Sequence, residues 1–291
     1  MNKQLQCGRF SFELDGPDSL RPVVMGILNV TPDSFSDGGR YQGLEFALGH
    51  AEDMMRDGAT MIDIGGESTR PGAPSVPLDE ELRRVMPALY ALKTLDVALS
   101  VDTCKPQVMR EALIAGADMI NDINGFRASG ALDAVLDSDC GLCVMHMQAT
   151  PETMQQAPQY ADVVGEVIAF LRERVDAMTA AGIERSRICV DPGFGFGKTV
   201  EHNYALLNGL GRIRDELDLP VLAGMSRKSM IGAVTGRPLE GRMPGSIGAA
   251  LAAVAHGARI VRVHDVAETV DALKVWHAAM NPGASVSAAT V

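Results

Sequence analysis

Residue types that bind anions, metals or heterocycles stand at the ends of short apolar runs throughout this chain. The last run, Ile260–Asp265, is the most informative. Alternate side chains of a strand share a face, so Arg262 and His264 are predicted to point the same way. An arginine and a histidine side by side suit an anion such as a phosphate. The polar residues at or just past the other runs are Asn29, Thr69 with Arg70, Asp102, Asn121 with Asp122, His146, Asp191, and Ser226 with Lys228.

These polar residues must be positioned by the apolar runs, which alternate with helical patterns of about 10 to 20 residues. Repeated strand-helix units require a parallel sheet, because each crossover returns the chain in the same direction. Eight such units in 291 residues predict a single-domain α/β fold of the closed (β/α)8 barrel type, whose C-terminal strand ends converge on one mouth. An open doubly wound sheet would also place ligands at the carboxyl ends, but it gives no reason for all eight strands to carry site residues. The runs are 23–30, 59–66, 97–103, 117–124, 142–148, 187–193, 219–226 and 259–265.

Three segments of different character divide the chain. Residues 1–22 are expected to form an N-terminal extension or short hairpin, and residues 23–280 the barrel. Residues 281–291 are rich in Ala and Ser, which predicts a flexible tail. Apolar residues at three- and four-residue steps predict one helix over 201–217 and another after the last run.

The composition restricts the partners. A formal net charge of −11 argues against nucleic acid, whose binding needs a basic surface. No apolar stretch reaches the roughly 18 residues of a membrane helix, and the N-terminus lacks a secretory signal pattern, so we expect a cytoplasmic protein. Arg70, Lys228 and Arg262 nevertheless predict a local site for a small phosphorylated ligand.

Two glycine-containing loops could contribute to this site. The run from Met25 breaks at Pro32 into a long polar loop ending at Gly39, which is typical of a lid, although a plain surface loop would look the same. The stretch Val190–Thr199 is not a P-loop, because Pro192 occupies the position of the first glycine. Its Phe196 could instead offer a face to a flat ring, the alternative being ordinary core packing.

Motifs on all eight runs, in order from about Val23 to Met280, resemble those of the dihydropteroate synthase family. The resemblance implies a (β/α)8 barrel, a homodimer, and condensation of 6-hydroxymethyl-7,8-dihydropterin diphosphate with p-aminobenzoate to dihydropteroate and pyrophosphate. It also implies a dissociative reaction through a pterin cation. The motifs are N-V-T-P-D-S-F-S-D-G-G, G-G-E-S-T-R-P-G, S-V-D-T, I-N-D-I, V-M-H-M-Q, D-P-G-F-G-F-G-K, G-M-S-R-K-S and R-V-H-D-V.

The same resemblance implies a role for each matching residue. Residues that would hydrogen-bond the pterin are Asp102, Asn121, Asp191 and Lys228, and those that would line its faces are Ile123, Met145 and Phe196. The expected diphosphate ligands are Asn29, Arg70, Arg262 and His264, with Mg²⁺ bridging Asn29 and the diphosphate. The expected p-aminobenzoate pocket comprises Thr69, Arg70, Pro71, Lys228 and Ser229. The expected catalytic residues are Asp37, Asp102, Lys228 and Arg262.

Two alternatives fit a pterin-binding barrel. A folate-dependent methyltransferase domain would need a corrinoid partner and would not need the loop Ser68–Pro71. A non-catalytic pterin-binding paralogue would be expected to lose the diphosphate residues, whereas Arg70, Arg262 and His264 are all present.

Overall fold

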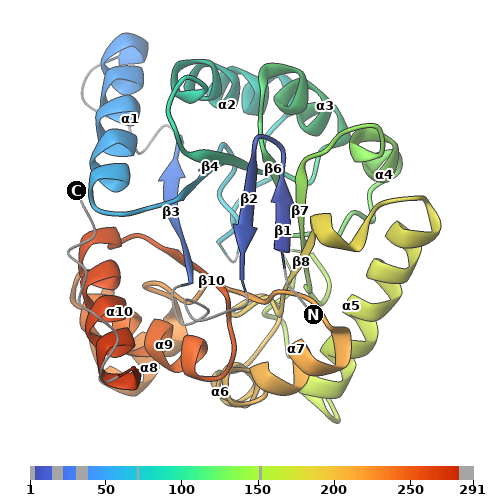
Figure 1. The fold of residues 1–291 in the computed structure, drawn as a ribbon. Coiled ribbons are helices and arrows are strands. Elements are labelled where there is room, and N and C mark those ends of the chain that lie inside the picture. The colour runs from blue at the N-terminus through green and yellow to red at the C-terminus, as the bar shows by residue number, and fades with distance from the viewer. Residues whose placement is uncertain (1–3, 15–21, 31–38, 71, 151–152, 282–291) are drawn as a thin grey trace.

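The computed structural model describes residues 4–14, 22–30, 39–70, 72–150 and 153–281. Eight parallel strands form one sheet in the order β8-β7-β6-β5-β4-β3-β10-β9, which confirms the predicted barrel (Figure 1). The sheet is closed by a single bridge between Val190 and Val221, beside which the Val190 N–H donates to the Pro220 carbonyl at 2.9 Å. The strands are β3 Val23–Asn29, β4 Met61–Gly65, β5 Ala98–Asp102, β6 Met119–Asp122, β7 Gly141–Met145, β8 Ile188–Asp191, β9 Leu222–Ala223 and β10 Ile260–Val263.

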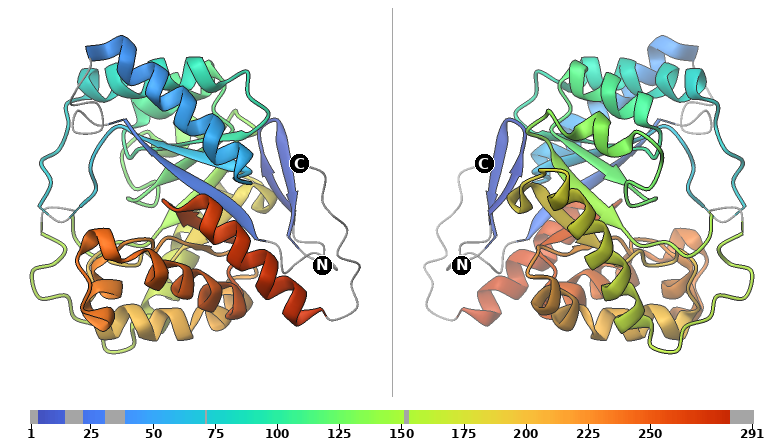
Figure 2. Two further views of the ribbon diagram at one scale, coloured as in Figure 1. Left: turned by 90° about the vertical axis from the view of Figure 1, so that its left-hand side faces the viewer. Right: turned by 90° about the vertical axis from the view of Figure 1, so that its right-hand side faces the viewer.

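Helices surround this sheet and cover its outer face (Figures 1 and 2). The final helix lies where the apolar periodicity predicts it, with Val266 and Leu273 buried. The predicted helix over 201–217 is instead two helices that meet at Gly209, where an added Cβ would lie 2.8 Å from Val164. The helices are α1 Gly39–Arg56, α2 Leu78–Leu92, α3 Pro106–Ala115, α4 Ala131–Val135, α5 Val163–Ala180, α6 Val200–Asn208, α7 Leu210–Leu217, α8 Ser229–Thr235, α9 Met243–Ala255 and α10 Val266–Met280.

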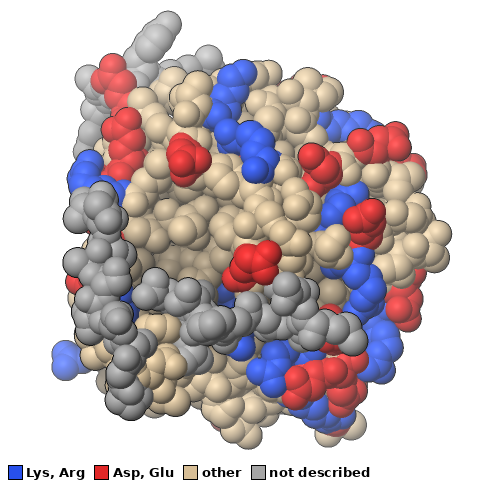
Figure 3. Space-filling model, viewed as in Figure 1, with Lys and Arg blue, Asp and Glu red and all other residues tan. Residues whose placement is uncertain are grey.

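An antiparallel hairpin, β1 Gln4–Cys7 and β2 Phe10–Glu13, covers the N-terminal end of the barrel. Figure 2 shows it at the end opposite the long β4–α2 loop. Arg9 on its turn donates through Nη2 to Asp118 at 2.8 Å. On this face, acidic and basic residues are interspersed and no broad basic patch is visible (Figure 3).

The side chains inside the barrel change in character along its axis. The hairpin residues Leu5 and Cys7 pack on an apolar layer at the N-terminal end. Two residues further along the strands, the layer contains the buried polar residues Asp63, Ser100 and Asn121. Burying these groups costs free energy unless they are paired, so the polar layer marks the end of the barrel that we examine for a site. The apolar layer comprises Met25, Met61, Ala98, Met119, Cys143, Cys189, Leu222 and Ile260.

Candidate active site

Arg262 joins carboxylates from two neighbouring strands at the centre of the polar layer. Its Nε donates to Asp63 Oδ2 at 2.6 Å, and its Nη2 donates to Asp102 Oδ2 at 3.1 Å. Asn121 Nδ2 donates to the same Asp63 oxygen at 3.2 Å. The predicted residues Asp102, Asn121 and Arg262 therefore meet, and Asp63 is the residue that connects them.

Burial and mutual charge shift the ionisation of this group. Burial and the negative charge of Asp63 raise the pKa of Asp102 to about 7, although Arg262 opposes the shift. Burial disfavours the charged guanidinium, but Asp63 and Asp102 raise the pKa of Arg262 overall. Arg262 is therefore a permanent cation next to a carboxyl group that titrates close to neutrality.

A second part of the site combines charged side chains with an aromatic face. Asp191 Oδ1 accepts the Gly193 N–H at 2.7 Å, and burial raises the pKa of this carboxyl while Lys228 partly offsets it. Burial lowers the pKa of Lys228 to about 8, against the pull of Asp191. Lys228 Nζ stands 4.6 Å from the centroid of Phe196.

Apolar side chains from three strand ends gather next to these polar groups. Ile123, Met145 and Phe196 belong to one small buried cluster, so the three residues predicted to line a flat ring lie together. Met147 and Met154 complete it. Apolar faces beside directional polar groups are the usual features of a site for a small heterocycle.

His264 stands at the mouth in a neutral state. Burial and the charge of Arg262 lower the pKa of His264 to about 4. The Ser226 hydroxyl accepts the His264 backbone N–H at 3.2 Å and lies 3.0 Å from His264 Nδ1. If that hydroxyl donates to Nδ1, Nε2 carries the ring proton and can donate to an anion. His264 would thus offer a neutral hydrogen bond, whereas Arg262 supplies the charge.

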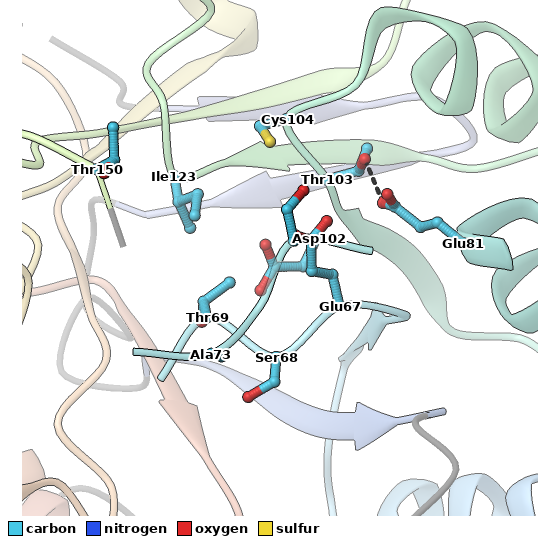
Figure 4. Close-up of a pocket in the computed structure, with 11 residues that line it drawn as sticks. Glu67, Ser68, Thr69, Ala73, Glu81, Asp102, Thr103, Cys104, Ile123 and Thr150 are labelled. Atoms are coloured by element: carbon cyan, nitrogen blue, oxygen red, sulfur yellow. Dashed lines mark hydrogen bonds between the residues drawn. The ribbon is translucent and has the colours of Figure 1, made fainter. Parts of the chain in front are cut away.

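A cavity at the mouth is bordered by the loops that follow β4, β5, β6 and β7 (Figure 4). The predicted residues Thr69, Asp102 and Ile123 all line it. Arg70 is exposed, and its charge is one of several that lower the pKa of His264 after the effects of burial and of Arg262. The lining residues are Glu67, Ser68, Thr69, Ala73, Ser75, Glu81, Asp102, Thr103, Cys104, Ile123 and Thr150.

An ion cluster beneath this cavity holds the β4–α2 loop. Lys105 forms ion pairs with Glu67 and with Glu81, and its Nζ lies 2.5 Å from Glu81 Oε2. Glu81 is fully buried and also accepts the Thr103 hydroxyl at 2.5 Å. Glu67 accepts the Val76 N–H at 3.1 Å, so one side chain connects the two ends of the loop that carries Thr69.

The remaining predicted site residues are Asn29, Ser229, Asp37 and Pro71, and the structure describes the first two. Asn29 ends β3 with an exposed side chain. A Cβ atom added at Gly65 would lie 3.7 Å from Asn29 Oδ1 and 3.9 Å from Asp102 Cβ, so these two side chains flank the same glycine. Ser229 is exposed at the first position of α8, directly after Lys228. Asp37 and Pro71 lie outside the described residues.

Sequence reasoning missed two buried charged residues, Asp63 and Lys198. Asp63 is fully buried in β4, and the signal for it was a lone carboxylate between two isoleucines. Lys198 Nζ lies 2.9 Å from His146 Nδ1, and burial lowers the pKa of Lys198 to about 7. Its signal was a lysine at the end of a glycine-rich run that does not fit a P-loop.

No group of three or more His, Cys, Asp or Glu side chains within the described residues could form a metal site on its own. Asn29 beside Asp102 is compatible with a metal that takes most of its ligands from water and substrate, as Mg²⁺ does. None of the helices in the described ranges has the length and apolar character needed to cross a bilayer.

A barrel with directional polar groups beside apolar side chains at its C-terminal strand ends is suited to binding a small heterocycle. The family model described as pterin binding enzyme matches residues 25–264. The chain is 51% identical over 261 residues to the dihydropteroate synthase of Haemophilus influenzae, covering 89% of this chain and 94% of that protein. It is 49% identical over 265 residues to the Escherichia coli enzyme of the same name, covering 91% and 94%. The chain belongs to the dihydropteroate synthase family.

Solved structures agree with this membership. A Burkholderia cenocepacia dihydropteroate synthase complexed with 7,8-dihydropteroate is 55% identical, with a TM-score of 0.86 and coverage of 96% of this chain and 97% of that one. A Xanthomonas albilineans dihydropteroate synthase with 4-aminobenzoic acid is 51% identical, with a TM-score of 0.89 and coverage of 96% and 99%.

Proposed function

We propose that this protein condenses 6-hydroxymethyl-7,8-dihydropterin diphosphate with p-aminobenzoate, forming dihydropteroate and pyrophosphate. The observation that carries the proposal is that hydrogen-bonding side chains, an apolar cluster and a buried cation lie together at the C-terminal strand ends. Asp102 and Asn121 belong to the part of the site around Arg262, which lies between carboxylates. Asp191 and Lys228 belong to the second part, beside Phe196.

The pterin would lie deep in the barrel. Its edge offers N–H donors and ring acceptors, which Asp191, Asn121 and Lys228 can pair. Burial strengthens each of these hydrogen bonds. Met145 and Phe196, both buried, would contact the two flat faces of the ring system.

The diphosphate would lie at the rim, bound by Asn29, Arg70, Arg262 and His264. Arg262 would provide a fixed charge, and neutral His264 a hydrogen bond, because its pKa is about 4. We propose that Asn29 would hold Mg²⁺ together with the substrate, and that the bound ion would supply positive charge next to the diphosphate. Few protein ligands are needed, because Mg²⁺ retains waters and uses substrate oxygens.

The reaction would proceed by departure of the diphosphate before attack. The bond between the pterin methylene carbon and the diphosphate oxygen breaks, and its electron pair leaves with the diphosphate. Arg262 stabilises that charge, while Asp102, with Asp37, stabilises the pterin cation. The amino nitrogen of p-aminobenzoate then forms the new carbon–nitrogen bond and releases a proton.

The p-aminobenzoate would bind on the cavity side of the mouth, between Thr69, Arg70 and Pro71 and the segment Lys228–Ser229. Arg70 and Lys228 supply positive charge for its carboxylate. Thr69 lines the cavity at this place (Figure 4). The X. albilineans enzyme with 4-aminobenzoic acid supports a subsite for this substrate in the family.

A homodimer, a cytoplasmic location and the absence of a nucleic-acid partner complete the proposal. The acidic net charge of −11 supports the last of these. The sequence of α9, MPGSIGAALAAVA, is apolar on all sides, although Pro244, Gly248 and Ala255 are exposed, which suits burial against a second copy. Sedimentation of the purified protein tests this: the mass of one chain alone would contradict the dimer.

The test of function is direct. Purified protein, Mg²⁺, the pterin diphosphate and labelled p-aminobenzoate are expected to yield labelled dihydropteroate and one pyrophosphate per product. Omission of the pterin diphosphate is the control. Absence of labelled product, with methyl transfer to a corrinoid protein instead, would support the methyltransferase alternative. Pterin binding without either reaction would support a non-catalytic paralogue.

A further inference from the structure

The turn between β8 and α6, residues 193–197, is held by side chains from outside it. The four consecutive carbonyl groups of residues 194–197 each accept a hydrogen bond from a side chain. A turn whose consecutive carbonyl groups are all paired with side chains has little freedom to change shape. The pairs are Lys228 with Phe194 O, Gln155 with Gly195 O at 2.6 Å, Lys198 with Phe196 O at 3.0 Å, and Tyr160 with Gly197 O at 2.9 Å.

The backbone of this turn is pressed against the end of β7. Gly193 has a φ of +72°, and a Cβ there would lie only 1.9 Å from the His146 carbonyl oxygen. Gly197 has a φ of +64°, and its Cβ would lie 2.9 Å from the Gln148 carbonyl oxygen. Glycine is required at both positions for close approach as well as for the left-handed conformation.

Lys198 provides the buried connection between the turn and β7. Its side-chain nitrogen has three acceptors within reach: His146 Nδ1 at 2.9 Å, the His146 carbonyl at 3.5 Å and the Phe196 carbonyl at 3.0 Å. Lys198 is only 3% exposed. Three acceptors match the three N–H groups of an ammonium.

The partner of Lys198 is itself fixed. The His146 ring packs edge-on against Phe170, with centroids 4.9 Å apart and planes at 85°. Burial and the charge of Lys198 lower the pKa of His146 to about 3, so its ring is neutral and Nδ1 can accept. Around the ammonium stand Asp191, which favours its charge, and Lys228, which opposes it.

We infer that Lys198 is a positioning residue for the proposed pterin site: seated between His146 and the Phe196 carbonyl, it fixes the 193–197 turn and thereby the Phe196 ring and the Asp191 carboxylate. Asp191 is coupled to the turn because it accepts the Gly193 N–H. The inference rests on the proposed function. It predicts a larger effect on the pterin than on p-aminobenzoate, because the loop of Thr69 on the p-aminobenzoate side is held by a separate ion cluster. Lys228 is the residue of the p-aminobenzoate subsite that also donates to the turn.

Lys198→Met tests the inference, with Lys274→Met as matched control, since Lys274 is an exposed lysine on α10 that makes no contact with the turn. The affinity for 6-hydroxymethylpterin, which carries no diphosphate, is measured by calorimetry. The KM of p-aminobenzoate is measured in the enzymatic reaction at saturating pterin diphosphate. Lys198→Met is expected to weaken pterin binding about tenfold or more, because it leaves the acceptors of a buried hydrogen-bond donor without a partner. The KM of p-aminobenzoate should stay within about twofold for Lys198→Met. For Lys274→Met, both the pterin affinity and this KM should stay within about twofold of the unmutated protein.

Tyr160→Phe covers the case in which Lys198→Met does not fold, judged by circular dichroism. It removes only the hydroxyl that donates to Gly197 and is expected to weaken pterin binding severalfold. Unchanged pterin affinity in folded Lys198→Met, or in Tyr160→Phe if the former does not fold, overturns the inference. Equal weakening of both substrates also overturns it. The proposed function fails separately if the unmutated protein neither binds pterin nor forms product.

Discussion

Replacing Arg262 by Met should destabilise the protein as well as slow the reaction. Arg262 bonds two carboxylates at 2.6 and 3.1 Å, and these partners, Asp63 and Asp102, are 0% and 9% exposed. Removing one partner of a buried ion pair costs about 3 to 5 kcal/mol, because the other charge is left without compensation. We expect about 3 kcal/mol at neutral pH, since Asn121 still donates to Asp63.

The deficit should depend on pH in a defined direction. Arg262 lowers the pKa of Asp102, which is about 7 in its presence, so its removal raises that pKa further. A carboxyl group whose pKa is higher in the folded than in the unfolded state stabilises the fold at acidic pH, and this stability is lost as pH rises through the folded pKa. Each unit of additional shift costs about 1.4 kcal/mol above that pH. The deficit should therefore be larger at alkaline than at mildly acidic pH.

Urea unfolding followed by circular dichroism, on both sides of neutrality, measures this deficit. Arg237→Met, which removes an exposed arginine, is the control and should have almost no effect. Turnover of the folded variant should fall by about 2 to 4 kcal/mol of transition-state stabilisation. A deficit that is independent of pH, or one below about 1 kcal/mol at every pH, would refute the role of Arg262 as counter-charge.

Four further predictions follow from other contacts. Lys105→Met leaves fully buried Glu81 without its ion partner and should cost about 3 kcal/mol in urea unfolding; a change under 1 kcal/mol would contradict the cluster. Gly193→Ala should abolish pterin binding in calorimetry, because the new Cβ would lie 1.9 Å from the His146 carbonyl oxygen. Gly116→Ala, at a φ of +105° but in open space, should cost only about 1 kcal/mol of stability. Equal effects of the two substitutions would argue against the close approach of the turn to His146. Turnover should rise with pH through about 7 as Asp102 ionises, and a flat profile would exclude a need for its charge. Chelation by EDTA should stop turnover and added Mg²⁺ restore it, while activity that survives chelation would oppose the proposed metal.

The strands and the direction of their side chains could be predicted from sequence because both depend on local pattern. Each apolar run became a barrel strand, and Arg262 lies on the interior face that its alternation with valines indicates. The meeting of Asp102 and Asn121 was also predictable, because neighbouring parallel strands end at one edge.

Properties that depend on three-dimensional neighbours could not be read from the sequence. The neutral state of His264 results from burial and from the charge of Arg262, and Asp63 gains its role only from the guanidinium that reaches it across the barrel. At Gly209, where the two helices meet, the close approach of Val164 from another helix leaves no room for a side chain. Periodicity along one segment contains no information about any of these contacts.

The short strand β9 has a consequence for how the barrel wall holds together. Between β8 and β9 the backbone contributes little more than the bridge of Val190 and Val221, so this boundary is the weakest part of the sheet. Asp191 and Lys228 stand on its two sides. A heterocycle bonded to both would act as a cross-link between them, and the amide hydrogens of residues 221–223 would exchange more slowly in the complex than in the free enzyme.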